Sequence, residues 1–274
     1  RRLPLTAPLE PEHAAMRCCV TSTPSFLYEP IDVLKQVGDD LWIVDGPEVV
    51  MFLYGLKVPF PTRMTIARLS NGDLWCHSPT VLTADLKAQI DGLGPVRHLV
   101  SPNKIHYVNI GAWASAYPEA TTWASPGVRT MAQKKKAKIR FDADLQDQAP
   151  LDWRGDLEQM IFHGNAYLDE VVFYHPKSRT LILTDLIENF EPARLNQVSR
   201  SSRWLLQIGG CVGPDGQAPL DLRLAFCPKK REARRSFQRL LAWQPERLLF
   251  AHGRWCERDG TQQLLRSFRW LTRH

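Results

Sequence analysis

The stretch EVVFYHPKSRTLILTDLIEN, residues 170–189, decides how this chain folds. It contains two runs rich in β-branched and aromatic residues, 171–174 and 180–183, on either side of the turn-forming segment 176–179. Both runs are apolar on both faces, which predicts two strands of a sheet that is covered on both sides. The second run ends on Thr184-Asp185, so a carboxylate is expected at the rim of the sheet. Loops at that rim are where α/β proteins carry their chemistry.

The predicted register of this hairpin brings two acidic residues together. A two-residue turn at Lys177-Ser178 would pair Glu170 with Asp185, and directly opposed residues lie roughly 4.5–5.5 Å apart on one face of a sheet. Two carboxylates at that distance repel, so a positive group or a shared proton is expected between them. A bound metal ion is one interpretation, and a buried salt bridge to an arginine is the other.

Length and composition restrict the class of protein. The 274 residues suffice for one large domain or two small ones, and the 44% hydrophobic and 23% charged residues are ordinary for a globular protein. No run of about 18 apolar residues occurs, which predicts no membrane span. The net charge of +6 permits an anionic substrate but does not indicate nucleic-acid binding. The expected partner is a small molecule, with neither nucleic acid nor membrane.

The cysteines and the chain ends suggest the setting and the domain organisation. The six cysteines form no CxxC pair, and scattered free thiols are typical of a reducing, cytoplasmic compartment. Residues 1–30 are rich in Pro, Glu and Ala without a clear period, so we expect an irregular arm followed by a single domain over 31–274. The lysine-rich residues 134–138 are predicted to be a solvated surface segment.

The order of the remaining elements alternates strands with helices. Strands are predicted at 41–47, closed by a Gly-Pro turn, and at 64–69, 74–77, 96–100, 121–124, 157–162 and 247–251; helices are predicted from about 83, 107, 192, 229 and 261. The loop SPNKIH, residues 101–106, follows one strand, and His252-Gly253 ends another. Polar residues at strand ends again mark one edge of the predicted sheet.

This order, together with several short motifs, resembles the metallo-β-lactamase superfamily. The motifs are Arg63-Met64-Thr65, His77-Ser78-Pro79, Pro102-Asn103 followed by His106, Glu170-Val171-Val172-Phe173, Ser178-Arg179-Thr180-Leu181, the run 184–190, and Ala251-His252-Gly253. They cover residues 28–270 and are closest to a branch of that superfamily defined by a domain of unknown function. The resemblance implies an α/β (α+β) fold, an αββα sandwich with metal ligands on loops along one edge.

The resemblance also implies a reduced set of metal ligands. Asp185 matches the bridging aspartate, His252 the last histidine ligand, and His106 the last histidine of the His-x-His-x-Asp-His motif. His77 replaces the usual early aspartate, and His163 would match the remaining histidine only with a shift of three residues. The implied site holds one divalent metal between His106, Asp185 and His252. Two histidines and a carboxylate suit zinc with an open position or iron(II).

Other residues are assigned around this triad. Glu170, opposite Asp185, is predicted to be a fourth ligand or a general base. His175 is rejected, because six strand positions at about 3.3 Å each put it roughly 20 Å from Asp185. Contacts to the substrate or to the ligands are predicted for His77, Asn103, Lys104 and His163.

The function that the resemblance implies is hydrolysis of a small ester, thioester or lactone. A bound metal lowers the pKa of water and polarises a carbonyl, with Glu170 or Asp185 taking the proton. A mononuclear iron oxygenase using the same three ligands is the alternative. A member that binds a ligand without catalysis is the third possibility, because several ligands of the superfamily motif are missing.

Overall fold

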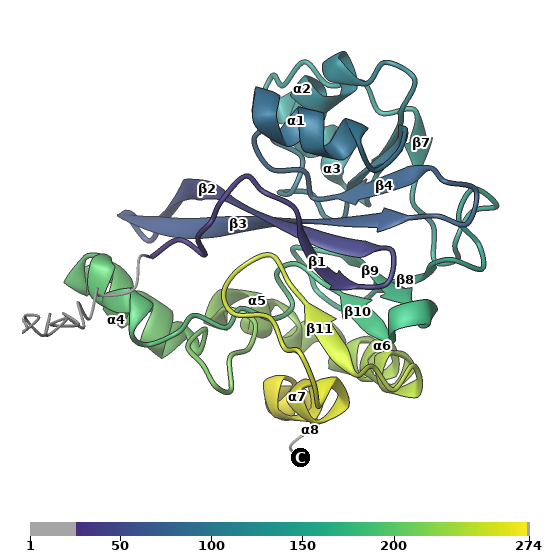
Figure 1. Ribbon diagram of the computed structural model, residues 1–274. Coiled ribbons are helices and arrows are strands. Elements are labelled where there is room, and N and C mark those ends of the chain that lie inside the picture. Colours follow the sequence, from purple (N-terminus) through teal and green to yellow (C-terminus); the bar gives the residue numbers. More distant parts are fainter. Residues whose placement is uncertain (1–25, 273–274) are drawn as a thin grey trace, which may run out of the picture.

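Two β-sheets stacked face to face, with helices over the outer face of each, form the body of the protein in a computed structural model that describes residues 26–272 (Figure 1). The first sheet has seven strands in the order β1-β2-β3-β4-β5-β6-β7, and the second has four in the order β11-β10-β9-β8. The predicted αββα sandwich is therefore confirmed.

The strands follow the chain in two groups. The seven-stranded sheet comprises β1 (Lys35–Gly38), β2 (Leu41–Leu53), β3 (Leu56–Arg68), β4 (Leu74–His77), β5 (Val96–Ser101), β6 (Thr121–Ala124) and β7 (Ala143–Asp144). The four-stranded sheet comprises β8 (Glu158–Phe162), β9 (Glu170–His175), β10 (Thr180–Ile182) and β11 (Arg247–Leu249). The helices are α1 (Ala84–Asp91), α2 (Ile110–Ala116), α3 (Val128–Lys134), α4 (Arg200–Gly209), α5 (Leu220–Ala225), α6 (Lys230–Ala242), α7 (Gly260–Ser267) and α8 (Arg269–Thr272).

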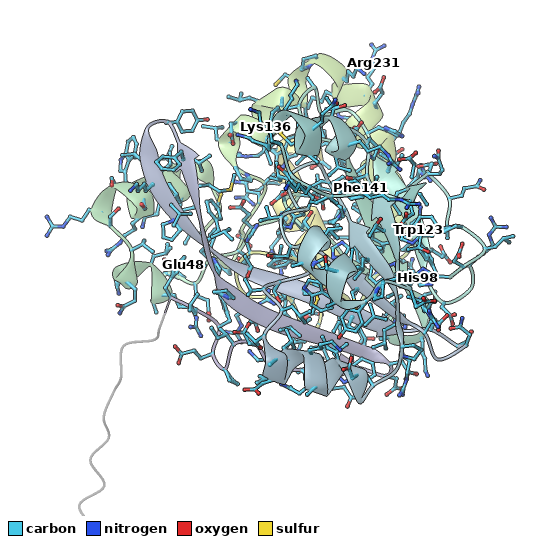
Figure 2. The ribbon with its side chains drawn as sticks, turned by 90° about the horizontal axis from the view of Figure 1, so that it is seen from above. Glu48, His98, Trp123, Lys136, Phe141 and Arg231 are labelled. Atoms are coloured by element: carbon cyan, nitrogen blue, oxygen red, sulfur yellow. The ribbon has the colours of Figure 1, made fainter. Side chains whose placement is uncertain are left out.

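Each layer boundary is filled by buried apolar side chains. Helices α1, α2 and α3 pack on the outer face of the first sheet, and α6 and α7 pack on the outer face of the second. The space between the sheets holds large aromatic residues such as Trp75 and Phe173, whose ring centroids lie 4.7 Å apart. His98 of β5 belongs to this packing, because Trp123 of β6 donates a hydrogen bond to it (Figure 2).

The hairpin of β9 and β10 has the predicted register. Thr180 pairs with His175, and Ile182 pairs with Phe173. The connection is not a two-residue turn but a 3₁₀ turn over Pro176–Ser178, closed by Arg179 in the left-handed region. His175 is hydrogen-bonded to Ser178 at this turn, at the opposite end of the hairpin from Asp185. The register is unchanged because the longer turn starts and ends at the same paired residues.

The prediction of a strand at 41–47 is wrong about where the strand ends. Strand β2 passes through a bulge between Gly46 and Glu48 and continues to Leu53. It turns at Tyr54-Gly55, where both residues have positive φ, and returns as the 13-residue β3. This β2–β3 ribbon extends well beyond the rest of the sheet (Figure 1). Pro47 lies at this bulge, between Gly46 and Glu48. Proline is compatible with a strand there, because a ladder hydrogen bond is already missing at a bulge.

Two helix starts also differ from the predictions. The helix expected from residue 192 begins only at Arg200, where Ser199 caps it by accepting a hydrogen bond from Ser202, and a 3₁₀ turn, Arg194–Gln197, precedes it. The helix expected from residue 107 begins at Ile110. In both cases a residue before the helix donates a side-chain hydrogen bond to another segment: Arg194 to the carbonyl of Leu27, and Asn109 to the carbonyl of Pro79.

The surface and the chain ends complete the description. Most of the predicted arm over 1–30 lies outside the described residues, but Phe26 stacks on Phe190 with ring centroids 6.3 Å apart, so its last residues join the folded body. The lysines of the segment 134–138 are exposed, as predicted; Lys136 is labelled in Figure 2. Among the described residues, no helix has the length and apolar character needed to cross a membrane.

Candidate metal centre

The ends of three strands meet at one edge of the sandwich and carry the candidate site. The loop after β5 contains Asn103 and His106, Thr184-Asp185 follows β10, and His252 follows β11. The two sheets touch here, because the backbone N–H of Val171 donates to the carbonyl of Pro102 at 2.8 Å. Side chains from both sheets are thereby fixed relative to one another.

Three side chains from these loops form a compact donor cluster. The Nε2 atom of His106 lies 3.3 Å from the Asp185 carboxylate, and Nε2 of His252 lies 3.4 Å from Asp185 Oδ1. One donor atom from each residue lies within 4.8 Å of the other two. Ligands about 2.0–2.2 Å from one metal ion have this spacing. The structure thus brings together the three residues predicted to be ligands.

Hydrogen bonds on the far side of each imidazole orient the two histidines. His252 Nδ1 donates to the carbonyl of Pro61 at 2.8 Å, and its Nε2 is directed toward Asp185. His106 Nδ1 is hydrogen-bonded to the hydroxyl of Ser78 at 2.7 Å. Metal-binding histidines in proteins are held by such bonds from their second ring nitrogen.

The side chain of Asn103 connects the loops of the site through hydrogen bonds. Its Nδ2 donates to Asp185 Oδ2 at 2.7 Å and to the Thr184 hydroxyl at 2.9 Å. Its Oδ1 accepts the backbone N–H groups of Ile105 at 2.9 Å and His106 at 3.1 Å. The side chain is fully buried, so it links two ligand-bearing loops without reaching a substrate.

Glu170 differs from its predicted roles as fourth ligand or general base. Its two carboxylate oxygens accept the backbone N–H groups of Thr184 at 2.7 Å and Asp185 at 2.8 Å. The side chain is fully buried and stands outside the donor cluster. Burial, together with the charge of Asp185, raises the pKa of Glu170. Glu170 therefore shapes the loop that carries Asp185, because the amides at the end of β10 take up both of its oxygens.

The electrostatics of the cluster favour an ionised aspartate. Burial acts to raise the pKa of Asp185, but the His106 and His252 imidazoles outweigh burial and hold the pKa below its ordinary value. Burial likewise acts to lower the pKa of His106, while the neighbouring Asp185 carboxylate raises it above the ordinary value overall. A carboxylate kept charged between two imidazoles offers the negative charge that a cation requires.

The other predicted contact residues lie away from the cluster. His77 is buried against Trp75, and burial, then the charge of His106, lowers its pKa to about 3. His163 is half exposed, with Nδ1 3.9 Å from Asp169. Lys104 bends over the ring of Tyr167 and donates to its carbonyl. These three placements depend on packing between distant segments, which strand-end patterns do not report.

The comparisons with known proteins agree with this architecture. A family model described as "Domain of unknown function (DUF4336)" matches residues 38–203, more than half of the chain. The chain belongs to this family. The matched segment includes His106 and Asp185 and ends before His252. None of the curated proteins matches this DUF4336 member.

Solved structures with the metallo-β-lactamase fold resemble this DUF4336 member along most of its length. DIM-1 metallo-β-lactamase exposed to ceftazidime shares 15% identity at a TM-score of 0.56, covering 89% of this chain and 96% of its own. A metallo-β-lactamase from Pontibacter korlensis shares 16% at 0.57, covering 88% and 99%. The Flv1 flavodiiron core from Synechocystis sp. PCC6803 shares 14% at 0.58, covering 87% and 60%. Identities this low establish the fold alone.

Arg63 is a positioning residue of this DUF4336 member to which sequence reasoning assigned no role. Its buried guanidinium donates to the carbonyls of Phe250 at 2.9 Å and Gly253 at 2.7 Å, on either side of His252, and pairs with Asp45 at 2.7 Å. Gly253 has a φ of 95°, and a Cβ there would lie 2.3 Å from the Asn189 carbonyl oxygen. Arg63 directly precedes the strand predicted at 64–69, and only the longer observed strand β3 places it inside the sheet.

A cleft of about 360 Å³ opens directly onto the donor cluster. His106 and His252 lie at its base, and the β2–β3 ribbon forms one wall. The other lining residues are mostly apolar or uncharged: Val49, Val50, Met51, Thr62, Ser78, Pro79, Ile105, Val108 and Asn109. The cluster is therefore buried yet accessible to a small molecule.

Proposed function

We propose that this chain is a hydrolase that holds one divalent metal ion, zinc or iron(II), between His106, Asp185 and His252, and acts on a small ester, thioester or lactone. The observation that carries the proposal is the buried donor cluster at the base of the cleft. Its substrate class follows the superfamily and is an analogy at the level of the fold.

The residues present fit a metal ion. Two imidazole Nε2 atoms face one ionised carboxylate, and partners behind the cluster fix the orientation of all three groups. Three protein ligands leave a position for water or substrate, as in catalytic zinc sites. When bound, the metal would supply a water of lowered pKa and polarise a carbonyl oxygen.

The protein's own groups would position the substrate and handle the proton. Of the two carboxylates predicted to accept it, Glu170 lies outside the donor cluster with both oxygens on backbone amides, whereas Asp185 belongs to the cluster, so Asp185 is the acceptor that we propose. Asn103 fixes Oδ2 of Asp185, while Oδ1 faces the two imidazoles. The fixed orientation removes the need for reorganisation during the reaction.

The cleft favours an uncharged substrate with an apolar acyl group. Among the described residues that line it, none is lysine or arginine. The wall includes the exposed apolar side chains of Val50 and Val108. An anionic substrate, which the net charge permits, would therefore meet positive charge only at the metal ion, and we propose an ester, thioester or lactone with an aliphatic acyl part.

A second function is favoured by the ligand set itself. Two histidines and one carboxylate with open positions also form the facial triad of mononuclear iron(II) oxygenases. The same three side chains would then serve an oxidative reaction. Metal and oxygen dependence separates the two functions.

Turnover after metal replacement tests the proposal. Protein stripped with a chelator and reloaded with zinc should hydrolyse p-nitrophenyl esters or a thioester, and His252→Ala should not. His163→Ala is the matched control, because it removes a histidine that is exposed and outside the cluster. Activity that needs iron(II) and oxygen would indicate the oxygenase. Hydrolysis unchanged in His252→Ala, or no metal-dependent reaction at all, contradicts the proposed hydrolase.

A further inference from the structure

A second cavity, of about 470 Å³, lies on the other side of the β2–β3 ribbon. It is enclosed by the tip of the ribbon, helix α4 and the start of α5. None of the residues that line it also lines the cleft over the donor cluster. Phe60 stands between the two, since it lines this cavity and its ring lies edge-on to His252 at 5.3 Å. The cavity is thus a separate space.

The mouth of this cavity is a mainly apolar surface, beside which Asp221 lies hydrogen-bonded to Tyr54. Tyr54 of the ribbon tip is 73% exposed, and Trp204 and Ile208, one turn apart on α4, are 61% and 51% exposed. Leu220 at the start of α5 completes the rim. Contiguous exposed apolar groups of this size mark binding sites more often than plain surface. The volume falls in the range of cavities that bind small molecules, roughly 300–1,000 Å³.

A buried carboxyl group at the base of the cavity is hydrogen-bonded to Cys211 but has one oxygen without a partner. Glu188 lines the cavity and is only 3% exposed. Its Oε2 has no hydrogen-bond partner among the described residues. Buried polar atoms of native proteins are nearly always hydrogen-bonded, so an unpaired oxygen on a side chain that lines a cavity indicates a missing partner.

The protonation state of Glu188 indicates the charge of the missing partner. Burial raises the pKa of Glu188 to about 8, so the carboxyl group is mostly protonated at pH 7. A protonated carboxyl both donates and accepts a hydrogen bond. Cys211 beside it is also buried, and burial raises the pKa of its thiol. The base of the cavity is therefore suited to a neutral polar group and poorly suited to an ion.

We propose that this cavity is a second ligand-binding site, for an uncharged amphiphile whose aliphatic body fills the apolar space and whose single amide or hydroxyl group hydrogen-bonds to Glu188. Its apolar rim on α4 and α5 would cover the aliphatic body. The site is spatially separate from the cleft over the metal centre, because the two cavities share no lining residue.

Calorimetric titration with octanamide tests the proposed site through a pair of matched leucines. Leu220 and Leu224 are both exposed residues of α5, but only Leu220 lines the cavity. Leu220→Trp fills the space and should weaken binding by about tenfold or more, since a blocked apolar pocket loses most of its contact area. Leu224→Trp should bind as the wild type does. Val108→Trp, which obstructs the cleft over the donor cluster, should also leave binding unchanged.

The polar contact is tested at Glu188. Glu188→Gln keeps a donor and an acceptor and should retain binding, whereas Glu188→Leu should lose about tenfold, as expected for one buried hydrogen bond. Asp185→Ala should bind octanamide normally, so the result stands even if the metal site fails. No binding to the wild type overturns the proposal. Equal binding by Leu220→Trp or Glu188→Leu, or tighter binding of octylamine than of octanamide, overturns it as well.

Discussion

Replacing Asn103 by alanine should both destabilise the protein and weaken the metal centre. Asn103 is fully buried, and its side chain joins the loop that carries His106 to the loop that carries Asp185. Alanine removes every one of these hydrogen bonds and leaves their partners buried. The two loops would then lose their direct connection.

The loss of stability can be worked out from the hydrogen bonds that Asn103→Ala removes. The hydrogen bond to the Asp185 carboxylate is worth about 2 kcal/mol, and each of the three neutral bonds, to the Thr184 hydroxyl and from the amides of Ile105 and His106, about 1 kcal/mol. Some of this is regained when water enters the opened loop, so we expect a loss of about 4 kcal/mol in the free energy of unfolding. For a chain of this size that lowers Tm by roughly 8–16 °C. Metal affinity should fall by about 10–100-fold, as when other groups that orient ligands are removed.

Chemical unfolding and competition with a zinc chelator measure the two effects. Asn109→Ala is the control, because Asn109 lies in the same region and makes one side-chain hydrogen bond, to the Pro79 carbonyl at 3.0 Å. It should cost about 1 kcal/mol and leave metal affinity unchanged. An Asn103→Ala protein that unfolds within about 1 kcal/mol of the wild type, with equal zinc affinity, would refute the assigned role.

Three further predictions concern single features. Glu170→Gln turns an amide N–H₂ toward a backbone N–H and should cost about 2–3 kcal/mol in chemical unfolding; unchanged stability with lost turnover would instead make Glu170 a base. Because the pKa of Glu188 rises from 4.5 unfolded to about 8 folded, the stability due to its proton is full below the unfolded pKa and is lost as pH rises through the folded one. The Tm of Glu188→Gln relative to wild type should therefore rise from about pH 5 to pH 8, and a constant difference in thermal scans contradicts this. Charge reversal of the exposed lysines in residues 134–138 should change ester turnover and Tm little, whereas loss of turnover would indicate a polyanionic substrate.

The parts of the fold that could be predicted are those with strong local periodicity. The β9–β10 register followed from two apolar runs and the turn between them, although the turn itself has a different form. His106, Asp185 and His252 could be selected because the resemblance to the metallo-β-lactamase superfamily implies them as ligands, and Asp185 and His252 also end predicted strands. The outer half of the β2–β3 ribbon was not predicted, because Pro47 looks like a strand end and because this half exposes apolar residues such as Phe52.

The orientation of side chains around the cluster could not be predicted. The register places Glu170 opposite Asp185, but which groups its oxygens bind depends on the path of the backbone after β10. Arg63 holds carbonyls from a segment nearly two hundred residues away, a contact that no local pattern encodes. In the sequence, Glu188 looks like an ordinary acidic residue of a loop. Its burial depends on how α4 and the ribbon pack, which the sequence pattern does not show.

Metal content measured by mass spectrometry tests the central claim most directly. Wild-type protein incubated with zinc or, without oxygen, with iron(II), and then dialysed, should retain about one ion per chain, because the three donors form a single site. Asp185→Ala and His252→Ala should each retain only traces, since no spare donor replaces the lost one, while His163→Ala should bind as the wild type does. Wild-type protein that retains no metal, or an Asp185→Ala protein that retains as much as the wild type, would contradict a metal centre at His106, Asp185 and His252.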